Sequence, residues 1–166
     1  MTEGTPISPA ADLASFDQRF GEMRERLLRI CTGLVGTAHA EDVLHDAYLR
    51  TRGRLDQLND PDRVEAWVTR TAINLCYNRH RSQRRLRERL PSLAIARPDA
   101  ASRDPGLREL IERLSPRDRT VVVLYYGHGY QTDEIATLVG TSPANARSIL
   151  FRARRQLARQ LREADR

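Results

Sequence analysis

Two apolar stripes separated by a tight turn lie between residues 130 and 155, and they constrain the fold more than any other feature. The first stripe has helical spacing and consists of Ile135, Ala136, Leu138 and Val139. Gly140 is suited to ending a helix with a positive φ. Thr141 and Ser142 can cap the next helix, and Pro143 fits its first turn, where no N–H is needed. The pattern predicts a helix-turn-helix.

The second helix of this pair has two different faces. Its apolar face carries Ala146, Ile149, Leu150, Ala153, Leu157 and Leu161. The opposite direction falls near Ala144, Ser148, Phe151, Arg152 and Arg155. Short side chains followed by arginines suit a DNA major groove, because the helix can approach and arginine can bind guanine or phosphate. We therefore predict a recognition helix; the alternative is a solvated face of a small helical domain.

The net charge of +6 is concentrated in two segments, and all 28 basic residues are arginine. Residues 79–90 hold six arginines and one glutamate, and residues 147–166 hold seven arginines and two acids, so each segment carries +5. Two separate basic patches indicate two contacts with a polyanion.

Several protein classes are excluded by composition. No run of 18 apolar residues occurs, so no membrane insertion is expected, and the first residues lack a signal-peptide pattern. Cys31 and Cys76 lie in apolar helical contexts and are expected to be buried free thiols, with a redox pair as the alternative. We expect a cytoplasmic protein.

The rest of the chain reads as helices, so the fold class is all-α. We expect two small helical domains joined by a flexible linker, the C-terminal one being the helix-turn-helix. Three amphipathic helices are expected at about 12–34, 40–54 and 63–89, and the apolar run 121–126 is also expected to be helical. The expected division is a disordered N-terminus over 1–11, a first domain over 12–90, a proline-rich linker over 91–106 and a second domain over 107–166. The linker is expected to keep the two basic patches apart.

The third helix carries a second candidate nucleic-acid surface. Opposite its apolar stripe it presents Arg70, Tyr77, His80, Arg81 and Arg84. An aromatic ring among arginines suits a single strand, with charge for phosphates and a plane for bases. The alternative is an exposed face that is merely basic.

Catalytic chemistry is poorly supported. No phosphate-binding glycine loop, CxxC or HExxH motif occurs, and the four histidines are scattered. We therefore expect no catalytic residues, no metal, no cofactor and no enzymatic activity.

The ordered set of motifs resembles the extracytoplasmic-function group of the sigma-70 family of bacterial RNA polymerase sigma factors. Residues 40–50 (AEDVLHDAYLR) resemble its core-polymerase-binding helix, and residues 67–81 (WVTRTAINLCYNRHR) resemble its promoter-melting helix. Residues 114–136 and 140–154 resemble its C-terminal domain. The resemblance covers about residues 12–161 and departs at His45, at Arg52, at 142–146 and at Ile149.

The resemblance implies a role for each surface. It implies that the core polymerase is bound by Glu41, Asp42, His45, Asp46 and Arg50. It implies that the opened −10 strand is held by Asn59, Arg63, Arg70, Asn74, Tyr77, His80, Arg81 and Arg84. It implies that the −35 duplex is read by Ser142, Ala144, Asn145, Arg147, Ser148, Phe151, Arg152 and Arg155. The implied partners are core RNA polymerase, promoter DNA and an anti-sigma factor.

Three other functions fit the sequence less well. The C-terminal half also resembles the helix-turn-helix of response regulators, but residues 12–90 lack the alternating strands and helices of a receiver domain. A decoy that binds an inhibitor but not DNA would not need two basic patches. An enzyme acting on nucleic acid would need a metal or a nucleophile.

Overall fold

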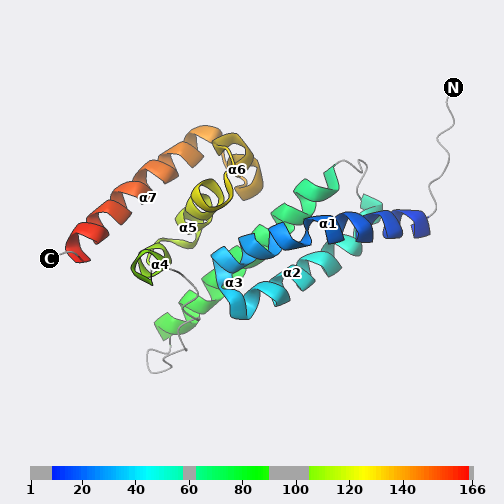
Figure 1. Ribbon diagram of the computed structural model, residues 1–166, viewed down its shortest axis with the longest axis horizontal. Coiled ribbons are helices and arrows are strands. Elements are labelled where there is room, and N and C mark those ends of the chain that lie inside the picture. Colours follow the sequence, from blue (N-terminus) through cyan, green and yellow to red (C-terminus); the bar gives the residue numbers. More distant parts are fainter. Residues whose placement is uncertain (1–8, 58–62, 90–104, 165–166) are drawn as a thin grey trace.

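The computed structural model describes residues 9–57, 63–89 and 105–164, and all its elements there are helical (Figure 1). The N-terminal half comprises α1 (Pro9–Val35), α2 (Thr37–Arg52), the 3₁₀ turn η1 (Leu55–Gln57) and α3 (Val64–Arg89). The C-terminal half comprises α4 (Pro105–Glu112), α5 (Pro116–Val122), the π-helical turn η3 (Val123–Gly127), α6 (Thr132–Val139) and α7 (Pro143–Ala164). The expected all-α fold is confirmed.

The first three helices form a bundle around an aromatic core. Phe16, Phe20 and Met23 of α1 pack with Leu44 of α2 and with the start of α3. The rings of Phe16 and Tyr48 stack with centroids 5.7 Å apart, and Tyr48 Oη donates a hydrogen bond to Asp17 at the surface, 2.9 Å away. Burying such aromatic side chains removes the largest apolar areas from water and fixes how α1 lies along α2.

Three boundaries differ from the expected ones, each by about one turn or less. Helix α1 already begins at Pro9, so the expected disorder of 1–11 is wrong for its last three residues, and residues 1–8 lie outside the described part. Helix α4 begins at Pro105, inside the expected linker. Pro9 and Pro105 each lie in a segment whose composition predicts irregular chain, yet proline is also well suited to the first turn of a helix. Helix α2 begins at Thr37, three residues before the expected start at about residue 40.

The apolar run 121–126 is helical as expected, but only its first part is buried. Ser115 caps α5 by accepting a hydrogen bond from the Asp118 amide at 3.1 Å. Val121, Val122, Val123 and Leu124 are buried. Tyr125 and Tyr126 are exposed, with rings edge to face at 4.9 Å, because η3 turns them outward.

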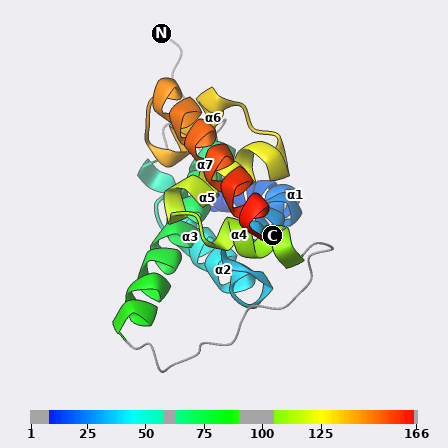
Figure 2. The same ribbon diagram turned by 90° about the vertical axis from the view of Figure 1, so that its left-hand side faces the viewer.

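The two halves pack against each other, contrary to the expected separation (Figures 1 and 2). One core cluster contains Ile30 and Leu34 of α1 and Ile73 of α3 together with Leu124 and Ile135 of the C-terminal half. Helix α3 contacts both α5 and α6, and α1 contacts η3. Short helices are stable only when their apolar faces are covered, and here each half covers part of the apolar surface of the other.

Cys31 and Cys76 are free thiols buried in this shared cluster, as expected. The pKa of the Cys76 thiol is raised far above its ordinary value, first because it hydrogen-bonds to Cys31 and then because it is buried. Within the described residues, no helix is long and apolar enough to cross a membrane.

Candidate nucleic-acid interface

The turn between α6 and α7 has the geometry of a helix-turn-helix. Gly140 adopts φ 67° and ψ 50°, a left-handed conformation that costs glycine little. The Thr141 amide donates to the Ala136 carbonyl at 2.8 Å, which closes α6. Ser142 Oγ accepts from the Asn145 amide at 3.2 Å, which caps α7. The two helices are held by buried side chains on both, among them Ile135, Leu138 and Ile149.

The expected recognition face of α7 is exposed along its length. Its members, all solvent-exposed, are Ser142, Ala144, Arg147, Ser148, Phe151, Arg152 and Arg155. Phe151 is 54% exposed, and the Arg155 guanidinium lies 5.8 Å from its ring centre. An exposed phenylalanine flanked by arginine offers an apolar surface for a base and a charge for a phosphate. Arg154, absent from the expected set, is exposed as well.

Two of the residues expected to contact the −35 duplex already have partners. Asn145 is half-buried, and its Nδ2 donates to Thr141 Oγ1 at 2.6 Å. Arg147 Nη1 lies 3.9 Å from Asp133 Oδ1 at the start of α6, a long and exposed pair. Asn145 therefore stabilises the turn, whereas Arg147 is held only weakly and can turn toward a phosphate.

The expected strand-binding residues of α3 divide into exposed and partly covered groups. Arg63, Arg70, Asn74 and Arg81 are exposed, whereas Tyr77 and His80 are half-buried. Asn59 lies outside the described residues, and the Arg84 side chain is not described. Arg70, Asn74, Tyr77 and Arg81 share one face of α3, as the helical period requires.

His80 lies between the two halves rather than on a free face. Its Nε2 donates to the Leu34 carbonyl, since a carbonyl oxygen can only accept. Arg119 Nη1 of α5 lies 2.9 Å from Nε2 and 3.2 Å from Nδ1. Because Nε2 donates to Leu34, Nδ1 is the nitrogen that can accept from Arg119. Arg119 is only 8% exposed and also donates to the carbonyls of Ile111, at 3.2 Å, and Glu112. The ring therefore joins α1, α3 and the C-terminal half.

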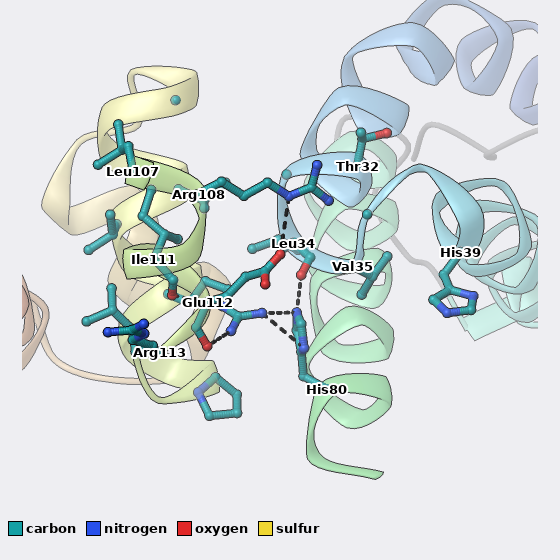
Figure 3. A pocket seen from close by; sticks show the side chains of 18 of the residues that line it. Thr32, Leu34, Val35, His39, His80, Leu107, Arg108, Ile111, Glu112 and Arg113 are labelled. Carbon is teal, nitrogen blue, oxygen red and sulfur yellow. Dashed lines mark hydrogen bonds and ion pairs between the residues drawn. The ribbon is translucent and has the colours of Figure 1, made fainter. Parts of the chain in front are cut away.

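A large groove surrounds this contact (Figure 3). It has a volume of about 760 Å³. Figure 3 shows Leu34, Val35 and His80 on one wall and Arg108, Ile111 and Glu112 on the other. Arg108 Nε pairs with Glu112 at 3.2 Å. The described residues hold no group of three or more metal-ligating side chains, here or elsewhere.

The loop before α6 packs on α1 through two titratable groups. The pKa of His128 is lowered, first by burial and then by the nearby charges of Arg29 and Arg26. The pKa of Tyr130 is raised, first by burial. The Tyr130 hydroxyl is buried with no hydrogen-bond partner among the described residues. A buried hydroxyl without a partner is costly, so this contact gains its stability from packing rather than polar bonding.

The expected polymerase-binding residues form an exposed face of α2. Glu41, Asp42, His45, Asp46 and Arg50 are all exposed. Glu41 accepts a hydrogen bond from Arg24 of α1 at 2.7 Å. Leu49, which is not among the expected polymerase contacts, is 51% exposed between them. The sequence alone could have indicated a binding role for Leu49, because a leucine is unexpected on the polar face of an amphipathic helix.

The sequence matches known families over most of its length. Residues 20–86 match the family described as Sigma-70 region 2, and residues 106–157 match the family described as Sigma-70, region 4. The RNA polymerase sigma-E factor of Streptomyces avermitilis is 29% identical over 163 residues, which cover 93% of this chain and 89% of that protein. The ECF RNA polymerase sigma factor SigJ of Mycobacterium tuberculosis is 31% identical over 157 residues, which cover 85% of this chain and 49% of that protein.

Two solved structures share the fold. The sigma factor RpoE of Bartonella quintana, solved with the anti-sigma factor NepR, has a TM-score of 0.68 at 19% identity, covering 89% of this chain and 96% of that one. CnrH, solved with the cytosolic domain of CnrY, has a TM-score of 0.67 at 24% identity, and the match covers 95% of this chain and 96% of that one.

Two helical halves, each matching a sigma-70 region, define an RNA polymerase sigma factor of the sigma-70 family. Within that family, the chain belongs to the extracytoplasmic-function group. The response-regulator alternative requires a receiver domain with strands, and residues 9–57 and 63–89 contain none.

Proposed function

We propose that this chain binds core RNA polymerase through α2, holds an opened −10 strand along α3 and reads a −35 duplex with α7. The observation that carries the proposal is the pairing of two unlike DNA surfaces in one chain. The exposed face of α7 follows a helix-turn-helix, which suits duplex DNA, and the basic face of α3 carries Tyr77, which suits unpaired bases.

The contacts on α7 divide by chemistry. Ala144, Ser148 and Arg152 lie where side chains reach base edges, and Arg147 and Arg155 supply charge for phosphates. Ser142 acts as the helix cap. Asn145 acts through the turn unless its bond to Thr141 opens.

The contacts on α3 supply both charge and stacking. Arg70 and Arg81 would bind phosphates on either side of Tyr77, which would stack on a base. Taking a base out of the duplex costs a few kcal/mol, so the face must return that energy through stacking and charge. We assign Asn59, Arg63, Asn74 and Arg84 to the same strand surface and leave out His80, whose ring is bonded to Arg119.

The proposed partners are core RNA polymerase, promoter DNA and an anti-sigma factor. RpoE was solved with the anti-sigma factor NepR, and the shared fold supports a similar partner for this chain. We propose that the chain works by binding, without catalysis, and in the cytoplasm with the polymerase.

The experiment that tests the proposal is transcription from a promoter library. The purified chain is added to core polymerase, and transcript starts are mapped with and without it. We expect starts that require the chain and share two upstream sequence elements. A set of starts identical to that of core polymerase alone would contradict the proposal.

A further inference from the structure

We propose that Thr141 is a positioning residue for −35 recognition, because it holds the Asn145 side chain in the turn and thereby keeps it from reading a base. Base readout then falls to Ser148 and Arg152 further along α7. The inference rests on the proposed function, since it concerns which residues of the recognition helix contact base edges. Asn145 lies in the stretch 142–146, where the sequence departs from the family pattern that it otherwise resembles.

Asn145 occupies a position from which a side chain of a recognition helix can reach bases. It lies in the first turn of α7, three residues after the Ser142 cap, and the first residues of such a helix contact base edges in the major groove. An asparagine there can form a bidentate contact with adenine, in which Nδ2 donates to N7 and Oδ1 accepts from N6. This contact distinguishes adenine from the other three bases.

The structure holds the Asn145 side chain within the turn instead. Its Nδ2 donates to Thr141 Oγ1 at 2.6 Å, and the Asn145 backbone amide donates to Ser142 Oγ at 3.2 Å. A threonine hydroxyl can both donate and accept, so it can satisfy either end of the side-chain amide. Asn145 is half-buried, whereas Ala144 and Ser148 on either side of it are exposed. Both nitrogens of Asn145 are therefore bonded inside the turn.

Thr141 can hold Asn145 in place because its own backbone is fixed. The Thr141 amide donates to the Ala136 carbonyl at 2.8 Å, next to Gly140, whose left-handed conformation ends α6. The hydroxyl therefore bonds to α7 from a position that α6 sets. A bidentate contact with adenine requires both ends of the Asn145 amide to face the base, which breaks the bond to Thr141. Adenine must therefore compete with an intramolecular partner that is already bound.

Thr141→Val tests the inference, because it removes the hydroxyl and keeps the branched shape of the side chain. Thr141→Ser keeps the hydroxyl and should behave as the wild type. Thr137→Val is the matched control, since Thr137 is exposed on α6 and its hydroxyl donates to the Asp133 carbonyl of the same helix at 3.1 Å. Thermal unfolding of each variant checks that it folds.

The measurement is selection of promoters by the complex of the full chain with core polymerase. The duplex library is randomised over the −35 element and otherwise copies one promoter mapped with the wild-type chain. We expect Thr141→Val to gain a preference for adenine of about tenfold at one −35 position, within the range for a good bidentate contact. Thr141→Ser and Thr137→Val should select the wild-type element.

Asn145→Ala shows whether the gained preference comes from Asn145. Added to Thr141→Val, it should remove the preference for adenine. Made alone, it should leave the wild-type −35 element unchanged, because the Asn145 side chain is already withheld from the bases by Thr141.

Two results would overturn the inference. One is an unchanged base preference in a folded Thr141→Val, and the other is a loss of adenine preference when Asn145→Ala is made in the wild type. The second measurement needs no change at Thr141, so it decides the question even if the valine variant does not fold. A wild-type complex that selects no −35 sequence would refute the proposed −35 readout itself, and this inference with it.

Discussion

At the scale of single residues, Arg152 and Asn145 show which side-chain environments the helical position predicts and which it does not. Both were expected to read bases from α7. Arg152 is exposed in the third turn of α7, whereas Asn145 Nδ2 donates to Thr141 Oγ1 at 2.6 Å. The helical period was enough to place Arg152. The bond of Asn145 depends on how the turn folds, and no periodic pattern encodes that.

Arg152→Ala should weaken binding of the polymerase complex to promoter DNA by about 1–3 kcal/mol and relax discrimination at one −35 position. Arg159 lies on the same face about two turns further along, where a recognition helix has left the groove. Arg159→Ala should therefore change affinity much less. Competition binding with single-base promoter variants checks both. Equal losses in the two variants would place the contact elsewhere on α7.

His128 gives the packed arrangement a defined pH dependence. Burial and the charges of Arg29 and Arg26 lower its folded pKa below the ordinary 6.5. The unfolded chain therefore binds more protons than the folded chain as pH falls below that value. The stability contributed by neutral His128 is present above about pH 6.5 and lost as pH falls through the folded pKa.

Denaturant unfolding between pH 8 and pH 5 measures this effect. The wild type should lose stability on acidification, and His128→Gln should lose less. His45→Gln changes an exposed histidine of α2 and should follow the wild type. If the His128 and His45 variants behave alike, burial of His128 has no role in the pH response.

At the scale of elements, most of the fold was predictable and helix starts were not. The periods of three and four residues placed α1, α2, α3 and the helix-turn-helix. Pro9 and Pro105 lie in segments whose composition predicts irregular chain, yet each begins a helix. Proline has both effects, because it breaks a helix interior and favours a first turn. Local sequence alone does not separate these effects.

Helix α2 carries a prediction at this scale, because its polar face contains exposed Leu49. Leu49→Ala should weaken binding to core polymerase by about 1–2 kcal/mol, the range for losing part of a buried leucine. Its free energy of unfolding should barely change, because the side chain is exposed in the free chain. Leu161→Ala, at a 45% exposed leucine of α7, is the control. Polymerase titrations that show the same affinity for both variants would remove Leu49 from the interface.

At the scale of the whole molecule, the packing of the two halves against each other could not be predicted from the sequence. The apolar run 121–124 predicts that these side chains are buried, but such a run does not indicate which residues cover it. The helical period predicts that His80 lies on the free face of α3 with Tyr77, whereas the structure places it against Arg119. Such long-range contacts depend on how two helical surfaces fit. Gly33, whose missing side chain permits the close approach to Val123, is recognisable only once the two surfaces are together.

The central claim is that this sigma factor opens promoter DNA along α3, and permanganate reactivity of unpaired thymines tests it most directly. On a promoter chosen from the library, the chain with core polymerase should make thymines reactive upstream of the start. Alanines at Arg70, Tyr77 and Arg81 should abolish that reactivity while polymerase binding changes little. Duplex protection without reactive thymines in the wild type, or equal loss of opening and polymerase binding in the variant, would contradict the account.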